Sequence, residues 1–321
     1  MTASITATPP LGKYLASTEK KTRDKAIKSL STFLSDPSQD ALPRPEMIKL
    51  WKGIFYCFWM SDKPLVQQAL ASELAEIILT ITTTTSSLAF LSVFWETIVR
   101  EWNGIDRLRM DKYYMLVRRF VNASFRLLMR ENWDTKFVGE YNRILSREGG
   151  PLNPSDTRIP SSLPFHLSDI YLEELNKAMD ATPTISPAPL KTLLDPFLRL
   201  AARTSASTTY KHIQSTLIQP LLSSLSTPSE DSRSRKRRRL DSGSSEDGPS
   251  YPSINTNSCF DDPISGSLAC PVLRRKLLKG IFDVASESES RDSNRRRLYA
   301  LWKEEKDDDD DENEEDEDEE D

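Results

Sequence analysis

A row of cations between positions 104 and 130 is the pattern in this 321-residue sequence with the clearest chemical meaning. If the segment is helical, Lys112, Arg119, Arg126 and Arg130 share one face, and Arg109 lies beside them. Almost no acidic residue shares that face, and five cations over about 30 Å match the phosphate spacing of an RNA backbone. The alternative is a solvated face, or one whose cations pair with carboxylates of a neighbouring helix.

A second basic run, RSRKRRR, lies between positions 233 and 239 in a Ser-rich stretch. Exposed basic clusters of this density are typical of nuclear localisation signals or nonspecific RNA contacts. The alternative is a charged loop without a function. The sequence thus predicts a nuclear import receptor as a partner, contacted by Arg233, Arg235, Lys236, Arg237, Arg238 and Arg239.

The segment SESES, at positions 286 to 290, places three serines beside acidic residues. This pattern predicts phosphorylation of Ser286, Ser288 and Ser290 by an acidophilic kinase, which would extend the negative charge of the C-terminal region. Serines of this kind are also common in solvated linkers, and that interpretation stays open.

Enzyme chemistry finds little support. The two histidines, His166 and His212, stand alone, and we find no nucleophile pattern, no His/Cys metal spacing and no Gly-rich phosphate loop. A group of carboxylates could gather around Mg²⁺ for a ribonuclease, although helix capping and helix dipoles explain them equally well. These carboxylates are Asp62, Glu73, Glu76, Asp106 and Asp111. We expect no enzyme activity, no cofactor and no small-molecule substrate.

The elements that position these residues are expected to be helices. Up to about residue 225, apolar residues recur at helical spacing, and short connections join the helices. The sequence predicts an all-α fold of antiparallel helix pairs, stacked as a HEAT-like or ARM-like repeat body. Trp51, Phe55, Phe58 and Trp59 surround their helix, which is typical of a buried helix. The apolar run 54–60 is too short for the roughly 20 residues of a membrane span, so no membrane contact is expected.

Composition divides the chain into four parts. We expect a helical domain at 1–225, a disordered Ser/Pro-rich linker at 226–270, short helical segments at 271–304 and a disordered acidic tail at 305–321. The net charge is −6, yet 14 of the 49 acidic residues lie in the last 15 positions, so the body is basic. A basic body favours a polyanionic partner. The tail suits basic proteins or screens promiscuous RNA contacts.

Two long motifs carry a resemblance to a known family. LWKGIFYCFWMSDKPLVQQALASELAEI (50–77) and FLSVFWETIVREWNGIDRLRMDKYYMLVRRFV (90–121) resemble the eukaryotic ribosomal RNA processing protein 1 family of nucleolar Nop52 type, and the chain looks like a fungal-like member of it. The resemblance covers about residues 11–225. It implies that blocks 59–67 and 104–119 form core plus contact surface in this chain as in the family. Lys63 and Arg107 lie in these blocks and join the candidate contact residues. The resemblance implies no catalytic residue.

The resemblance implies a non-enzymatic assembly factor of the large (60S) ribosomal subunit precursor, located in the nucleus and nucleolus. Such a factor is needed for pre-rRNA processing and acts as a scaffold for other assembly factors, for pre-rRNA or for both. Two alternatives stay open. One is a nuclear adaptor or chaperone that holds basic proteins with its acidic tail, and the other is a metal-dependent ribonuclease.

Overall fold

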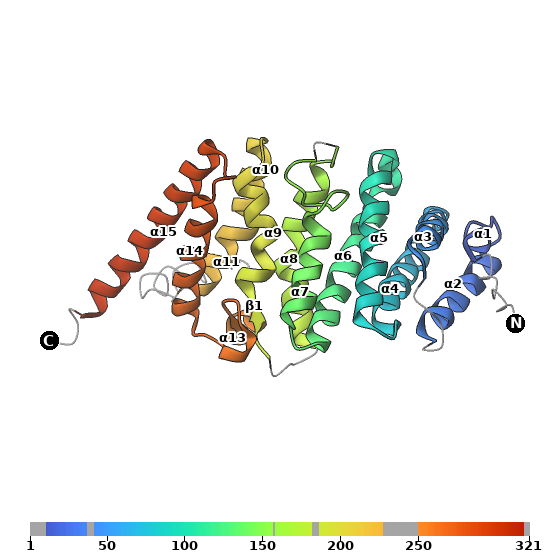
Figure 1. Cartoon of the computed structure of the whole chain (residues 1–321), viewed down its shortest axis with the longest axis horizontal. Helices are drawn as coiled ribbons and strands as arrows, with labels where there is room; N and C mark the ends of the chain where they lie inside the picture. The colour runs from blue at the N-terminus through green and yellow to red at the C-terminus, as the bar shows by residue number, and fades with distance from the viewer. Residues whose placement is uncertain (1–10, 37–41, 157, 182–185, 227–249, 318–321) are drawn as a thin grey trace, which may run out of the picture. The chain divides into compact units, whose positions relative to one another are not determined.

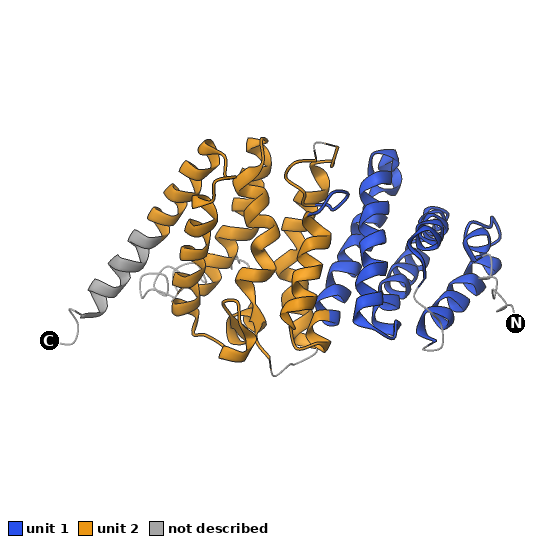
Figure 2. Cartoon of the chain, viewed as in Figure 1, with its two compact units in different colours: residues 1–127, 147–151 blue, residues 128–146, 152–321 orange. Residues whose placement is uncertain are grey.

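The computed structural model describes residues 11–36, 42–156, 158–181, 186–226 and 250–317, with side chains described as far as Glu305. These residues are helical almost throughout, as Figure 1 shows. The chain divides into two compact units (Figure 2). Unit 1 holds residues 1–127 and 147–151, and unit 2 holds residues 128–146 and 152–321.

Unit 1 is built from helices that alternate between two layers. Its elements are α1 (Leu11–Leu15), α2 (Lys20–Ser35), α3 (Arg44–Trp59), α4 (Pro64–Thr80), α5 (Thr84–Glu101), the 3₁₀ turn η1 (Trp102–Gly104) and most of α6 (Arg107–Arg130). Helix α1 packs on α3 and α3 on α5, while α2 packs on α4. This contact between every second helix is the pattern of stacked helix pairs, so the predicted helical repeat is confirmed.

Aromatic side chains fill the core of unit 1. Trp51 lies with its ring centroid 4.6 Å from that of Phe90, and Phe94 stacks on Phe120 at 3.9 Å. The indole Nε1 of Trp51 donates a hydrogen bond to the carbonyl oxygen of Phe90 (3.0 Å), so the polar atom of this buried ring is satisfied. Trp51, Phe55 and Phe58 of α3 therefore lie in the interior of a helix stack, as predicted, whereas Trp59 is partly exposed and Tyr56 is exposed.

Unit 2 continues the helical architecture. It contains α7 (Thr135–Ser146), α8 (Ser162–Ala181), α9 (Leu190–Arg203), α10 (Ser207–Ile213), the π-helical turn η2 (Gln214–Ile218), α11 (Gln219–Leu225), α13 (Pro252–Thr256), the 3₁₀ turn η3 (Pro263–Ser265), α14 (Cys270–Ser286) and α15 (Asp292–Glu317). Helix α7 packs on α9, α8 on α10, and the α14–α15 hairpin on α9. Two short strands, β1 (Ala188–Pro189) and β2 (Ser258–Cys259), pair in parallel.

The predicted disorder of the linker is wrong for residues 250–270. Tyr251 and Ile254 are buried, and the side-chain oxygen of Asn176 accepts a hydrogen bond from the backbone N–H of Ser253 (2.9 Å). Ser258 pairs with Ala188 through the two strands. A few well-placed apolar residues and backbone hydrogen bonds hold this segment on unit 2, and composition alone does not register them. The basic run at 233–239 lies outside the described residues, and so do the side chains of the acidic tail beyond Glu305.

Candidate functional site

The two motif blocks meet at the side chain of Lys112. This residue of α6 is only 5% exposed, and its ammonium donates hydrogen bonds to the carbonyl oxygens of Trp59 and Ser61, both at 2.7 Å. These carbonyls belong to the turn between α3 and α4. The predicted role of Lys112 as an exposed phosphate contact is therefore wrong. Its buried ammonium instead links block 104–119 to block 59–67 through these hydrogen bonds.

Neighbouring side chains make this junction rigid. The ring of Tyr113 packs on Phe55 and Phe58, with centroids 5.0 and 5.2 Å away, and its hydroxyl donates to the carbonyl oxygen of Phe55 (3.2 Å). Burial raises the pKa of Tyr113 above its ordinary range. Gln67 donates to the carbonyl oxygen of Ser61 (3.0 Å), so that both blocks supply hydrogen bonds to one turn.

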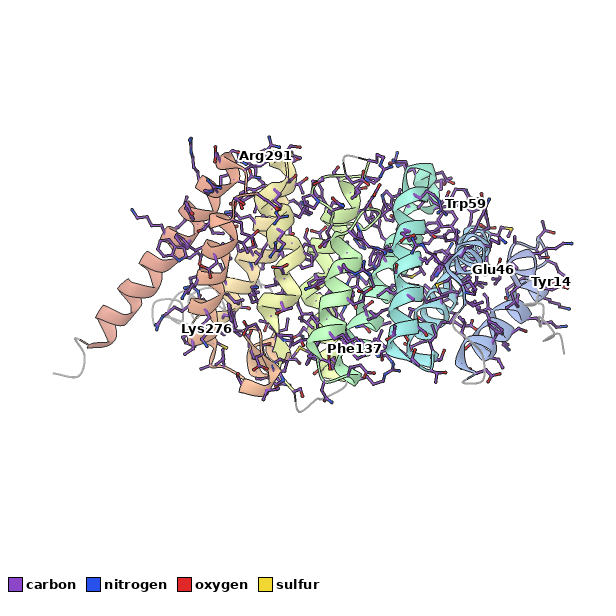
Figure 3. The ribbon with its side chains drawn as sticks, in the orientation of Figure 1. Tyr14, Glu46, Trp59, Phe137, Lys276 and Arg291 are labelled. Atoms are coloured by element: carbon purple, nitrogen blue, oxygen red, sulfur yellow. The ribbon has the colours of Figure 1, made fainter. Side chains whose placement is uncertain are left out.

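Burial also changes the ionisation of the junction. It is the main cause that lowers the pKa of Lys112 to about 8, and the cation of Arg109 lowers it further. Arg109 pairs with Asp106 at 2.5 Å and lies over the ring of Trp59, 4.8 Å from its centroid. The hydrogen bond from Arg109 holds the pKa of the Asp106 carboxyl below its ordinary value. Figure 3 labels Trp59, which marks this junction at the end of α3.

The rest of the predicted cationic stripe is largely neutralised by carboxylates. Arg126 forms an ion pair with Glu76 of α4, with Nη2 at 3.2 Å from Oε2, and Arg130 pairs with Glu131 at 3.2 Å. The alternative stated for this face, cations that pair with carboxylates of a neighbouring helix, therefore holds for Arg126, whereas Arg130 pairs with the next residue of the chain. Glu76 lies 50 residues earlier in the chain and comes into reach through the packing of α4 and α6.

Three candidate cations keep the exposure that a contact requires. Lys63, Arg107 and Arg119 are exposed, and none of them forms an ion pair with another residue that the structure describes. Lys63 precedes α4 and Arg107 begins α6, so these two flank the junction at Lys112. Their contact with RNA or protein stays a prediction.

The three serines of the SESES segment differ in accessibility. Ser290 is buried, and its hydroxyl donates to the carbonyl oxygen of Val284 (2.7 Å), so a kinase would have to open this turn to reach it. Ser286 and Ser288 are both exposed, and the hydroxyl of Ser286 donates a hydrogen bond to the carbonyl oxygen of Phe282 (2.9 Å). Exposure thus favours phosphorylation at Ser286 and Ser288 over Ser290.

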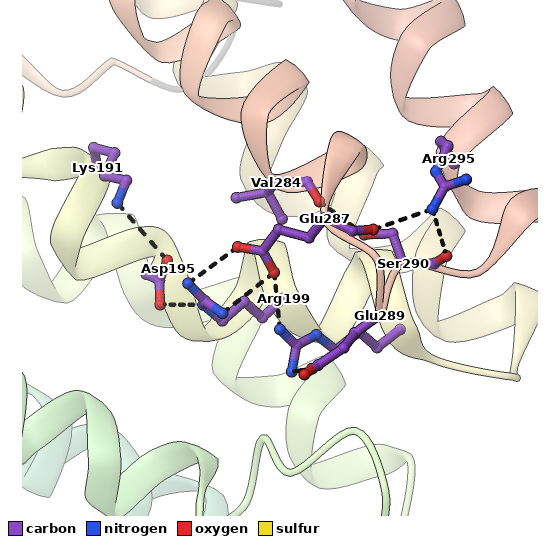
Figure 4. Close-up of polar contacts among 9 residues, drawn as sticks. Lys191, Asp195, Arg199, Val284, Glu287, Glu289, Ser290 and Arg295 are labelled. Atoms are coloured by element: carbon purple, nitrogen blue, oxygen red, sulfur yellow. Dashed lines mark hydrogen bonds and ion pairs between the residues drawn. The ribbon is translucent and has the colours of Figure 1, made fainter.

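The glutamates of the same segment anchor it to α9 (Figure 4). Glu287 pairs with Arg199 (3.2 Å) and with Arg203 (2.8 Å), and Glu289 also pairs with Arg203. The sequence pattern indicates the charge of this segment but not its partner. The signal that could have found one is the spacing of Asp195, Arg199 and Arg203, which places three charged side chains on one face of a helix.

The described residues offer little for catalysis. No three His, Cys, Asp or Glu side chains among them come together as a metal site, so the carboxylates considered for Mg²⁺ form no such group in this part of the chain. His212 pairs with Asp169 (2.8 Å) and stacks on Phe165. None of the helices in the described part is long and apolar enough to cross a bilayer.

The family profile and the relatives that this chain matches point to one family. The profile of a family described as nucleolar protein, Nop52, matches residues 6–321. Human ribosomal RNA processing protein 1 homolog A is 33% identical over 323 residues, covering 91% of this chain and 68% of the human protein. The mouse homolog A is 36% identical over 241 residues, covering 74% and 48%. The matched region thus spans about half to two thirds of the length of these relatives.

Proposed function

Because the chain belongs to the nucleolar protein Nop52 family, we propose that it is a non-enzymatic assembly factor of the large (60S) ribosomal subunit precursor. Membership makes it a nucleolar protein of ribosome biogenesis, and the names of its relatives associate it with ribosomal RNA processing. The finer proposal is that the helical body acts as a scaffold, to which other assembly factors and pre-rRNA bind. Stacked helices support this role because they present extended surfaces for large partners.

The observation that carries the scaffold proposal is an exposed surface beside the junction at Lys112. Leu65 and Leu108 are 79% and 94% exposed, although each lies within a few residues of the buried turn and the buried lysine. Together with Lys63 and Arg107 they form what we call the junction surface. Large apolar side chains held in water on a rigid support are typical of protein contact sites, and burying each contributes about 1.5–3 kcal/mol.

The junction surface combines two kinds of contact. The leucines suit the apolar side chains of a protein, and the two cations suit carboxylates or phosphates at its rim. Because Lys112 fixes the turn before α4 relative to the start of α6, binding here does not have to order the surface first. We therefore place an assembly factor, rather than RNA, on the junction surface.

A pair of charge substitutions tests this function. We expect Leu65→Glu with Leu108→Glu to leave the fold intact, since both side chains are exposed, but to move the tagged protein out of the large-subunit precursor in a sucrose gradient. Ile264→Glu is a control for placing a carboxylate at an exposed apolar position elsewhere, because Ile264 is 95% exposed in unit 2. Co-sedimentation of the double variant with the precursor at the wild-type level would contradict the scaffold role of this surface.

A further inference from the structure

We propose that the α14–α15 hairpin carries a binding platform for single-stranded RNA, distinct from the junction surface. The hairpin platform consists of three aromatic side chains, Phe282, Tyr299 and Trp302, and of four cations around them, Arg275, Lys279, Arg296 and Lys303. This inference rests on the proposed function in one respect only, namely that a ribosome assembly factor meets pre-rRNA.

The aromatic side chains form one partly exposed cluster. The ring centroid of Phe282 on α14 lies 4.9 Å from that of Tyr299 and 5.0 Å from that of Trp302, both on α15. All three residues are partly exposed rather than buried. The hydroxyl of Tyr299 lies 3.0 Å from that of Ser286, which holds its ring in place. Partly exposed rings of this kind offer faces on which bases stack, at about 1–3 kcal/mol for each base.

The cations lie on the same sides of the two helices as these rings. On α14, Arg275 and Lys279 precede Phe282 by seven and three residues, which places them on its face of the helix. On α15, Arg296 and Lys303 flank Tyr299 by three and four residues. Both runs extend about 10 Å along their helices. The rings thus have cations on either side.

The charge of these cations is available to a ligand. All four are exposed, and none pairs with a carboxylate within the described part of the chain. Most acids of the hairpin are already engaged, since Glu305 pairs with Arg274 (2.6 Å) and Asp292 with Arg295 (3.2 Å). Between residues 270 and 305, the exposed acids without a described ion pair are Asp283 and Glu304, so this part of the hairpin has a positive balance, although α15 continues into the acidic run after Lys306.

The platform is held rigidly on unit 2. Glu287 at the hairpin turn pairs with Arg199 and Arg203 of α9 (Figure 4), and the side-chain amide of Asn294 donates to the carbonyl oxygens of Ala201 (3.0 Å) and Thr204 (2.8 Å). The aromatic rings are therefore positioned before RNA arrives, and little ordering of the protein opposes binding. An acidic peptide would use the cations alone, whereas an RNA strand uses the cations and the ring faces, and this favours RNA as the occupant.

The test uses the purified full chain and a fluorescein-labelled oligouridine of about 12 nucleotides, followed by fluorescence anisotropy. We expect Arg275→Gln, Lys279→Gln, Arg296→Gln and Lys303→Gln together to weaken binding by about tenfold or more at 0.1 M salt. The slope of log K against log salt concentration should become less negative by up to about 3. Each phosphate contact with a single strand contributes about −0.7 to this slope, and up to four contacts are lost.

A matched control separates the platform from general charge. It replaces four other exposed cations that lack ion pairs among the described residues, in the substitutions Lys28→Gln, Lys52→Gln, Lys136→Gln and Lys211→Gln. This variant has the same net charge as the platform variant and should bind RNA within about twofold of the wild type. Equal losses in both variants would overturn the inference, because they would show that binding follows net charge.

A second measurement does not depend on the stability of a variant. Photocrosslinking of the wild-type chain to 4-thiouridine RNA, followed by peptide mass spectrometry, should place crosslinks within residues 275–303. Crosslinks confined to other segments, or no measurable RNA binding, would overturn the inference. So would a platform variant that keeps RNA affinity but loses a protein of the precursor. These outcomes leave the proposed function to be judged separately by the sedimentation of the junction-surface variant.

Discussion

Replacing Lys112 by Met tests how the two family motifs are joined. Met matches the length of the lysine stem but has no ammonium, so the carbonyl oxygens of Trp59 and Ser61 lose their donor. Leaving these two carbonyl oxygens without a donor costs about 1.5–3 kcal/mol each, or about 3–6 kcal/mol together, whether the lost amine was charged or neutral.

Burial of the ammonium opposes this contribution. The pKa of Lys112 falls from 10.5 to about 8, which corresponds to a penalty of about 3.4 kcal/mol on the charged form. The two effects largely offset each other and leave a net contribution of about 0–3 kcal/mol. We expect Lys112→Met to lower the free energy of unfolding by about 1–2 kcal/mol at pH 7.

The pH dependence of the same variant separates the two effects. Between the folded pKa of about 8 and the unfolded value of 10.5, the unfolded chain binds more protons than the folded one. The stability of the wild type therefore gains from Lys112 as the pH rises through this range, and Lys112→Met lacks that gain. From pH 7 to pH 9.5 the difference in unfolding free energy between them should grow by about 2 kcal/mol.

Urea unfolding followed by tryptophan fluorescence measures this difference, because Trp51 and Trp95 are buried in unit 1. The wild type and the variant are compared at each pH, so groups that titrate identically in both cancel. A difference that stays constant or shrinks as the pH rises would refute the reasoning, because it would mean that the buried ammonium carries no penalty.

Two further predictions concern the same unit and its cysteines. A Cβ at Gly53 would lie 2.8 Å from the carbonyl oxygen of Gly12, so Gly53→Ala should push α1 from α3 and destabilise the fold by about 1–3 kcal/mol in thermal melts. Gly104→Ala, whose Cβ would meet nothing within 4 Å, should not have this effect through steric clash. Burial raises the pKa of the Cys57 thiol to about 11. Maleimide at pH 8 should therefore label the partly exposed Cys270 about tenfold faster or more, and equal rates in peptide mapping would contradict this.

Local pattern was sufficient to predict the helical stack. The distribution of Trp51, Phe55, Phe58 and Trp59 around one helix indicated burial, and the first three are at most 7% exposed. Trp59 is partly exposed, however, and Tyr56 is 43% exposed, so one face of α3 remains in contact with solvent. The repeat architecture followed from helix lengths and short connections, both of which are local properties of a sequence. Helix lengths and connection lengths can be estimated without knowing which helices pack against each other.

The candidate site depended on contacts between distant residues and was predicted less well. The charge of Arg126 is met by Glu76 from another helix, and Lys112 turns inward to two carbonyl oxygens. A helical wheel reports the side of a helix on which a residue lies, but it does not report what packs against that side. For this reason the sequence alone did not decide between a free cationic face and one that pairs with a neighbouring helix.

Composition misjudged the segment after residue 250 for a related cause. Tyr251, Ile254 and Cys259 are few among many polar residues, yet each is buried against unit 2. The hairpin platform escaped notice similarly, because Phe282 meets Tyr299 only when α14 and α15 pack side by side. Aromatic residues spaced among cations on two consecutive helices were the signal available in the sequence.

Purification of the tagged full chain from cells, followed by sequencing of the ribosomal RNA that accompanies it, shows which ribosomal precursor the protein joins. If the protein is an assembly factor of the large ribosomal subunit, precursors of the large-subunit RNAs should be enriched over those of the small subunit. Recovery of small-subunit precursors at equal or higher levels, or of no precursor RNA, would contradict the account.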